Sequence, residues 1–166
     1  TVTLDTSSPA LLGATHTLEV SGAPANGVGL LLYSPFDAAL PTVVFIHGAV
    51  DDHSVWTLLA RWAAHHGFGV LAVDLSGHMR SAGPALSSVE AMADWLLAVL
   101  DAAGVKQAAL AGHSLGSLVA LEAAARAPER ATRLLMFGSA VPMSVTDALL
   151  NASRDAPHQA IDMVVT

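Results

Sequence analysis

Hydrophobic positions along the chain follow two alternating patterns. Short apolar runs occur at 42–46, 69–74, 107–112 and 132–140, and runs of this length are typical of strands buried on both faces. Between the runs, apolar residues recur at helical spacing, which predicts three amphipathic helices. The stripe of the first helix is Val55, Leu58, Leu59, Trp62 and Ala63, and that of the second is Met92, Trp95, Leu96, Val99 and Leu100. We interpret the tryptophans of these helices, Trp56, Trp62 and Trp95, as core residues.

Capping residues mark where the helices begin. Asp52 or Ser54 is expected to cap the first helix. Ser87 and Glu90 have the spacing of a capping box at the start of the second helix. The third helix is predicted to run over residues 115–127, because a proline follows it.

The alternation of four strands with three helices predicts an α/β fold, with a mostly parallel sheet and helices on both faces. Two earlier segments, 15–22 and 27–35, read as short antiparallel strands joined by a turn-rich link. From residue 142 the pattern changes, with no further convincing strand. Ser144 is expected to cap a short helix that ends near Leu150, and a second helix is expected to begin at residues 155–157.

Residues that could take part in catalysis or binding directly follow the carboxyl ends of the predicted parallel strands. His47 and Gly48 end the first, Asp74 the second, Gly112 to Ser114 the third, and Gly138 the fourth. Because ligands of open α/β sheets bind at the carboxyl ends of the strands, this edge is the predicted site. Asp74 is expected to tie the following loop rather than to act as a catalytic acid.

Ser114 lies in a G-x-S-x-G motif between a predicted strand and a predicted helix. A sharp strand-to-helix turn strains the serine backbone and needs glycine at both flanks, here Gly112 and Gly116. Such a turn presents the serine hydroxyl as a nucleophile. The alternative is a tight turn whose serine only caps the helix.

Two backbone amides are candidates for an oxyanion hole beside Ser114. The amide of Leu115 opens the helix that follows the serine, and the amide of Ala49 follows the His47-Gly48 turn. The alternative for residues 47–49 is an ordinary turn.

Composition narrows the classes of function. The formal net charge is −7 and the basic residues form no patch, which argues against nucleic-acid binding. The chain has no cysteine and no histidine–carboxylate spacing of a metal site, so no metal or cofactor is expected. Apolar runs are too short for a membrane span, and no signal peptide is recognised, from which we expect a cytoplasmic location.

Three segments resemble the α/β-hydrolase fold family, of the esterase, lipase and C–C hydrolase type. They are VVFIHGAVDDHSVW, GVLAVDLSGHMRSAG and the stretch from ALAGHSLGS to LLMFGSA. The second resembles the D-x-x-G-x-G-x-S stretch of the family, with Met79 in place of the second glycine. The resemblance implies the N-terminal part of a hydrolase core over residues 1–140, lacking its last strands, and the beginning of a helical cap over 141–166.

The resemblance implies a serine-dependent hydrolase that cleaves a carboxylic ester, a thioester or a related acyl bond through an acyl-enzyme. Its substrate would be a small acyl compound, with Ser114 as nucleophile and Ala49 and Leu115 at the oxyanion hole. C–C bond hydrolysis and cofactor-free haloperoxidation remain open within the same fold. A catalytically incomplete fragment, a ligand-binding protein and one half of a split enzyme also remain open.

The catalytic acid and base of the family follow the serine, in that order, and the expected segments lie beyond residue 166. Downstream of Ser114 the only histidine is His158, near Asp147, Asp155 and Asp162. These residues fall on cap-like helices, where nothing fixes them near the serine. We expect the missing C-terminal half, or a second copy of the chain, to associate with the exposed edge of the sheet.

The remaining histidines have structural interpretations. His47 is expected to brace the oxyanion loop, His78 to bond within its own loop, and His113 to be structural. His16 and His53 are interpreted as surface residues.

Overall fold

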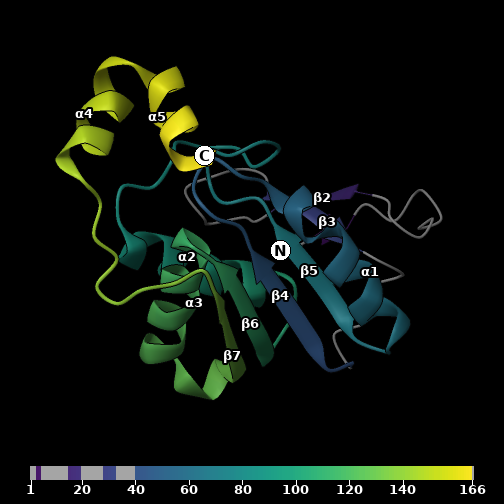
Figure 1. The fold of residues 1–166 in the computed structure, drawn as a ribbon. Helices are drawn as coiled ribbons and strands as arrows, with labels where there is room; N and C mark the ends of the chain where they lie inside the picture. Colours follow the sequence, from purple (N-terminus) through teal and green to yellow (C-terminus); the bar gives the residue numbers. More distant parts are fainter. Residues whose placement is uncertain (1–2, 5–14, 20–27, 33–39, 166) are drawn as a thin grey trace.

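Four parallel strands form the centre of the structure, a computed structural model that describes residues 3–4, 15–19, 28–32 and 40–165 (Figure 1). In chain order, the elements are β1 (Thr3–Leu4), β2 (Thr15–Glu19), β3 (Val28–Leu32), β4 (Thr42–Ile46), η1 (His53–Trp56), α1 (Thr57–His65), β5 (Gly69–Val73), α2 (Val89–Ala102), β6 (Ala108–His113), α3 (Leu115–Arg126), η2 (Pro128–Arg130), β7 (Ala131–Phe137), α4 (Asp147–Asp155) and α5 (Pro157–Val165).

The seven strands form one sheet in the order β1-β2-β3-β5-β4-β6-β7. Strands β5, β4, β6 and β7 are parallel, whereas β3 pairs antiparallel with β5 and β2 pairs antiparallel with β3. The predicted fold class and the antiparallel lead-in are therefore confirmed; positions 20–22, 27 and 33–35 of the lead-in lie outside the described residues. Ile46 is in register with Val73 and Gly112, so the carboxyl ends of β4, β5 and β6 meet at one edge.

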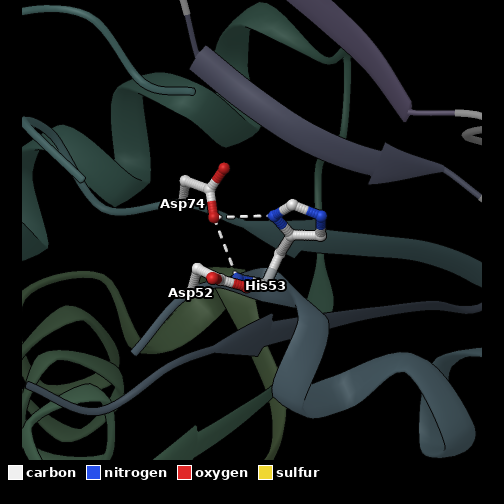
Figure 2. A group of neighbouring side chains, drawn as sticks. All are labelled: Asp52, His53 and Asp74. Atoms are coloured by element: carbon white, nitrogen blue, oxygen red, sulfur yellow. Dashed lines mark hydrogen bonds and ion pairs between the residues drawn. The ribbon is translucent and has the colours of Figure 1, made fainter. Parts of the chain in front are cut away.

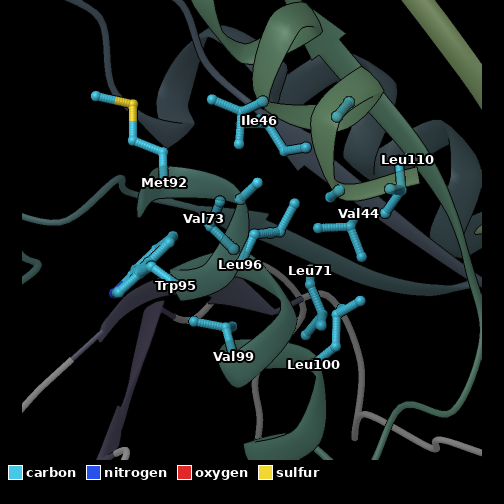
Figure 3. Packing of buried hydrophobic residues seen from close by; sticks show 14 of the residues in the cluster. Val44, Ile46, Leu71, Val73, Met92, Trp95, Leu96, Val99, Leu100 and Leu110 are labelled. Atoms are coloured by element: carbon cyan, nitrogen blue, oxygen red, sulfur yellow. The ribbon is translucent and has the colours of Figure 1, made fainter. Parts of the chain in front are cut away.

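The central strands divide their side chains between two faces, as the period of two requires. Val44 and Ile46 point into a core formed with α2 and α3, which Figure 3 shows from close by. Val43 and Phe45 point to the opposite face, where they pack with Trp56 and the small residues of α1. Helices on both faces of a parallel sheet are the predicted architecture.

Two predicted helix caps need correction, and a third is confirmed. Ser88, not Ser87, caps α2, because its extended backbone lets its hydroxyl accept a hydrogen bond from the Ala91 amide at 3.2 Å. Thr146, not Ser144, caps α4, and that helix continues past Leu150 to Asp155. Asp52 does cap the first helical segment, which begins as the 3-10 turn η1. Adjacent hydroxyl residues satisfy the same capping pattern, so the spacing alone leaves this choice open.

Helix α1 contacts the sheet mainly through small residues, of which only Ala63 belongs to the predicted apolar stripe. Ala60 is fully buried and Trp56 is 5% exposed, whereas Leu58 is 80% and Trp62 is 58% exposed. The interpretation of Trp62 as a core residue is wrong in this structure, although Trp56 and Trp95 are buried as predicted. The small alanines bring α1 close to β4 and β5, which turns the larger residues away from them.

The exposed side of α1 borders an apolar groove that lies over β6 and β7. Its volume is about 240 Å³, and Arg133 is the only charged residue in a lining that also includes Leu59, Trp62, Leu135 and Phe137. Within the described part of the chain, no helix covers this half of the face. We call this groove the α1-side groove.

Helices α4 and α5 pack as a pair outside the layers that cover the sheet (Figure 1). Among the described side chains of the pair, Ala160 is the buried one. The division into a core and a cap at residue 140 stays a prediction. No helix in the described part of the chain is both long and apolar enough to cross a membrane.

We predict that the isolated chain self-associates through the α1-side groove, because the groove exposes Leu59 and Trp62 to water. The double variant Leu59→Glu/Trp62→Glu should be monomeric in size-exclusion chromatography with light scattering. Val145→Glu is the matched control, since Val145 is 49% exposed and lies outside the groove lining. A monomeric parent chain with a cooperative melt would contradict this prediction.

Candidate active site

Ser114 lies on a strained bend between β6 and α3. Its backbone has φ 50° and ψ −118°, a region that L-residues rarely occupy. Its amide donates to the Phe137 carbonyl at 2.9 Å, and its carbonyl accepts from both the amide and the hydroxyl of Ser117, at 2.9 and 2.6 Å. The bend is therefore held from both sides, by the next strand of the sheet and by the first turn of the helix.

Glycine is required at both flanks of the bend because the surrounding backbone leaves no room. A Cβ atom at Gly112 would lie 2.2 Å from the Gly116 carbonyl oxygen, and one at Gly116 would lie 2.2 Å from the Ile46 carbonyl oxygen. Gly116 thus packs α3 directly onto the end of β4. The packing explains in physical terms why the motif needs both glycines.

The loop that follows β4 lies against Ser114. A Cβ atom built on Gly48 would be 3.3 Å from Ser114 Cβ, and Ala49 next to it is exposed. Within the described part of the chain, the Ser114 hydroxyl and the amides of Ala49 and Leu115 make no hydrogen bond. A half-buried hydroxyl and two unused amides are thus available at one place. Their roles as nucleophile and oxyanion hole stay predictions.

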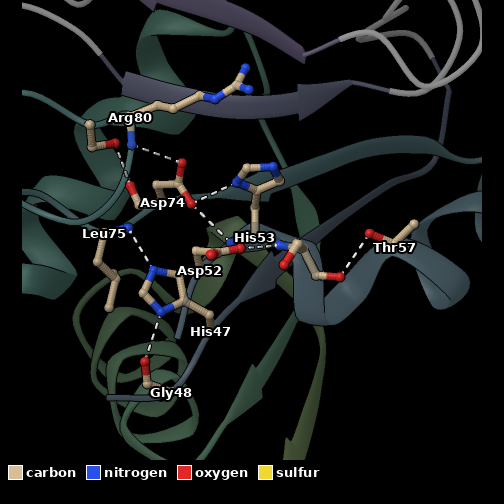
Figure 4. A network of polar contacts seen from close by, with 10 residues as sticks. His47, Gly48, Asp52, His53, Thr57, Asp74, Leu75 and Arg80 are labelled. Atoms are coloured by element: carbon tan, nitrogen blue, oxygen red, sulfur yellow. Dashed lines mark hydrogen bonds and ion pairs between the residues drawn. The ribbon is translucent and has the colours of Figure 1, made fainter. Parts of the chain in front are cut away.

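His47 links the loop after β4 to the end of β5. It is fully buried, and its Nε2 accepts a hydrogen bond from the Leu75 amide at 3.0 Å. Nδ1 must then carry the proton, and it donates to the Gly48 carbonyl at 2.7 Å (Figure 4). Burial lowers the pKa of His47 below its ordinary value, so the ring is neutral near pH 7. These contacts agree with the predicted bracing role.

Asp74 is fully buried and ties several backbone segments together. One carboxylate oxygen accepts from the His53 amide at 2.9 Å and from His53 Nδ1 at 2.8 Å (Figure 2). The other accepts from the Arg80 amide at 3.3 Å, and the Asp74 carbonyl accepts from the Ser81 hydroxyl at 2.6 Å. The expectation that Asp74 ties its loop is confirmed.

His53 is a residue whose role the sequence reasoning missed. It is 7% exposed and bonded to Asp74, so its interpretation as a surface residue is wrong. Asp52, His53 and Asp74 carry ligand atoms within 4.8 Å of one another, a set of residue types that bind metals. Asp52 accepts from the Ser54 amide at 2.7 Å, so each of the three side chains already has a hydrogen-bonding role in the loop.

The loop after Asp74 has positive φ at Gly77 (76°), Met79 (40°) and Gly83 (93°). Met79 occupies the position of the second glycine in the D-x-x-G-x-G-x-S stretch that this loop resembles. Met79 adopts left-handed backbone, a conformation that is more usual for glycine. His78 bonds within this loop, as predicted: its Nδ1 donates to the Ser76 carbonyl at 3.1 Å.

The other candidate bases do not reach Ser114 in the described part of the chain. His158 is exposed on α5 and has no hydrogen bond to the serine there. His113 points its Nδ1 toward Asp51 Oδ2 at 3.7 Å and is partly exposed. His16 lies in β2, and its side chain is outside the described residues.

The sequence profile of the family described as alpha/beta hydrolase fold matches residues 41–160. A protein of Mycobacterium phage D29 named as a non-heme haloperoxidase is 34% identical over 99 residues, covering 59% of this chain and 36% of that protein. Lipase LipV of Mycobacterium tuberculosis is 34% identical over 116 residues, covering 65% of this chain and 43% of the lipase. The chain thus spans well under half the length of these curated relatives.

Among solved structures, Cfl2 of Burkholderia cenocepacia superposes with a TM-score of 0.70 over 93% of this chain and 58% of Cfl2. The two sequences are 22% identical, so this likeness bears on the fold alone.

We predict that Gly116→Ala lowers the free energy of unfolding by about 1–3 kcal/mol, because the added methyl group meets the backbone of β4. Gly67→Ala is the control. Gly67 has φ +82° and open space around its Cβ position, so its substitution costs only backbone strain of about 1 kcal/mol. Urea denaturation measures both, and equal losses would contradict a packing role for Gly116.

We predict that stability falls as the pH falls below about 6.5, partly because of His47. The folded pKa is lowered, so the unfolded chain binds the proton first, and the loss continues until the folded pKa is reached. Above this window His47 contributes no pH dependence. His47→Gln should be about 1 kcal/mol less stable at pH 7.5. Its stability should decline less between pH 6.5 and 5.5 in urea titrations; an unchanged decline would exclude His47 as a source.

Proposed function

Since this chain belongs to the α/β-hydrolase fold family, we propose that it supplies the nucleophile and oxyanion hole of a serine hydrolase. The substrate class is a small carboxylic ester, a thioester or a related acyl compound. The observation that carries the proposal is the strained bend at Ser114 beside the Gly48–Ala49 loop, with a hydroxyl that makes no hydrogen bond to the described residues.

Each step assigns a role to atoms at this edge of the sheet. Ser114 Oγ attacks the carbonyl carbon of the substrate, and the amides of Ala49 and Leu115 stabilise the negative oxygen that forms. Leu115 is the first residue of α3, so the positive end of the helix dipole adds to this stabilisation. Collapse of the intermediate releases the alcohol or thiol, and water then hydrolyses the acyl-enzyme.

A general base must remove the proton from Ser114, and an acid must orient that base. We propose that both come from a further part of the polypeptide, because the match to this chain covers only 36% and 43% of two curated relatives. His47 is excluded as the base, since both ring nitrogens are hydrogen-bonded within the protein.

Cofactor-free haloperoxidation is a second candidate, and the phage relative named as a non-heme haloperoxidase supports it. In this reading, the same serine and amides would bind a small carboxylic acid. An assay of halide-dependent oxidation with hydrogen peroxide and an organic acid distinguishes haloperoxidation from ester cleavage.

A binding protein without turnover is the third possibility, and serine reactivity tests it. In the polypeptide that includes the acid and the histidine, Ser114→Ala should abolish labelling by a fluorophosphonate probe and lower kcat by about 10⁴-fold or more. Ser87→Ala, at an exposed position outside the bend, should label like the parent. Esterase activity that survives in Ser114→Ala would exclude the proposed mechanism.

A further inference from the structure

The middle of the loop between β4 and η1 carries backbone strain. Val50 has φ 59°, which is unfavourable for a β-branched residue, and both Ala49 and Val50 are exposed. The two ends of the loop are anchored: the Gly48 carbonyl accepts from His47, and the Asp52 carboxylate accepts from the Ser54 amide. The Ala49 amide lies between these anchors, so its position depends on what holds the middle of the loop.

Asp51 supplies a contact from the middle of this loop to the nucleophile bend. Its Oδ2 lies 3.7 Å from Nδ1 of His113, the residue directly before Ser114. The side chains are 33% and 45% exposed, so the pair lies at the rim of the candidate site.

Two glycines leave room for the His113 ring. A Cβ atom at Gly48 would lie 3.0 Å from His113 Nδ1 and 3.1 Å from Asp51 Oδ2. On the other side, a Cβ atom at Gly138 would lie 3.4 Å from His113 Cδ2 and Nε2. The imidazole therefore bridges the loop after β4 and the residue after β7. A ring seated between two backbone segments restricts both more than a freely rotating surface side chain would.

We propose that Asp51 and His113 act together as positioning residues that hold the loop, and with it the Ala49 amide, against the Ser114 bend. The catalytic consequence rests on the proposed function, whereas the mechanical role does not. Asp51 also interacts electrostatically with buried His47, so the test must separate the His113 contact from a general effect of the Asp51 charge.

Backbone ¹⁵N relaxation of the chain tests the mechanical role directly. The measurements use the Leu59→Glu/Trp62→Glu background, which we expect to be monomeric. We expect order parameters of Ala49 and Val50 near 0.85, falling toward 0.6 in Asp51→Asn and in His113→Gln. The double variant should fall no further than either single variant, because both remove the same contact. Asp101→Asn, which breaks the distant 2.7 Å pair with Arg130, is the control and should leave the loop unchanged.

Serine reactivity separates this inference from the proposed function. In the polypeptide that carries the base, either substitution should lower kcat about two- to fivefold, the effect of one partly exposed ion pair, with KM unchanged. Additive order-parameter changes, or a loop as rigid in the variants as in the parent, would overturn the inference even if Ser114 reacts. A loosened loop in a chain whose Ser114 never reacts would support the inference and reject the proposed function.

Discussion

The backbone bend at Ser114 is the constraint on which the rest of the site depends. An L-residue adopts φ 50° and ψ −118° only when its surroundings hold it there. Here the holding groups come from three parts of the fold: the Phe137 carbonyl of β7, the first turn of α3, and the carbonyls at the end of β4 against which Gly116 packs. The candidate nucleophile is therefore a product of the whole parallel sheet rather than of a local motif.

Helices cover one face of the sheet more completely than the other. On one face, α2 and α3 bury a continuous cluster that includes Leu96, Val99, Leu100 and Leu110 (Figure 3). On the other, α1 covers β4 and β5, and the outward residues of β7 remain exposed. Right-handed crossovers that continue past β7 would place further helices on the α2 and α3 face. Such crossover helices would therefore not cover the α1-side groove.

The sequence was sufficient to predict every described strand except β1, the parallel arrangement of β4 to β7, and the edge at which the candidate residues meet. It did not predict the order of the strands in the sheet. The apolar runs and the G-x-S-x-G context depend only on residues close together in the sequence, so they can be recognised before the tertiary structure is known. His53 was not predictable, because its burial depends on Asp74, a residue that lies 21 positions away, directly after β5. Trp62 was misjudged for a related reason. Helical spacing predicts that a stripe suits burial, but whether a partner covers it depends on surfaces outside the helix.

The hydrogen bond from the Ser114 amide to the Phe137 carbonyl has a consequence for dissecting hydrolases of this kind. A fragment truncated before β7 would retain every residue of the G-x-S-x-G motif yet lose the acceptor of the Ser114 amide, one of the contacts that hold the bend. Breakpoints for split reporters or chimeric enzymes built on this scaffold should accordingly fall after residue 138, so that the fragment that contains Ser114 also contains β7.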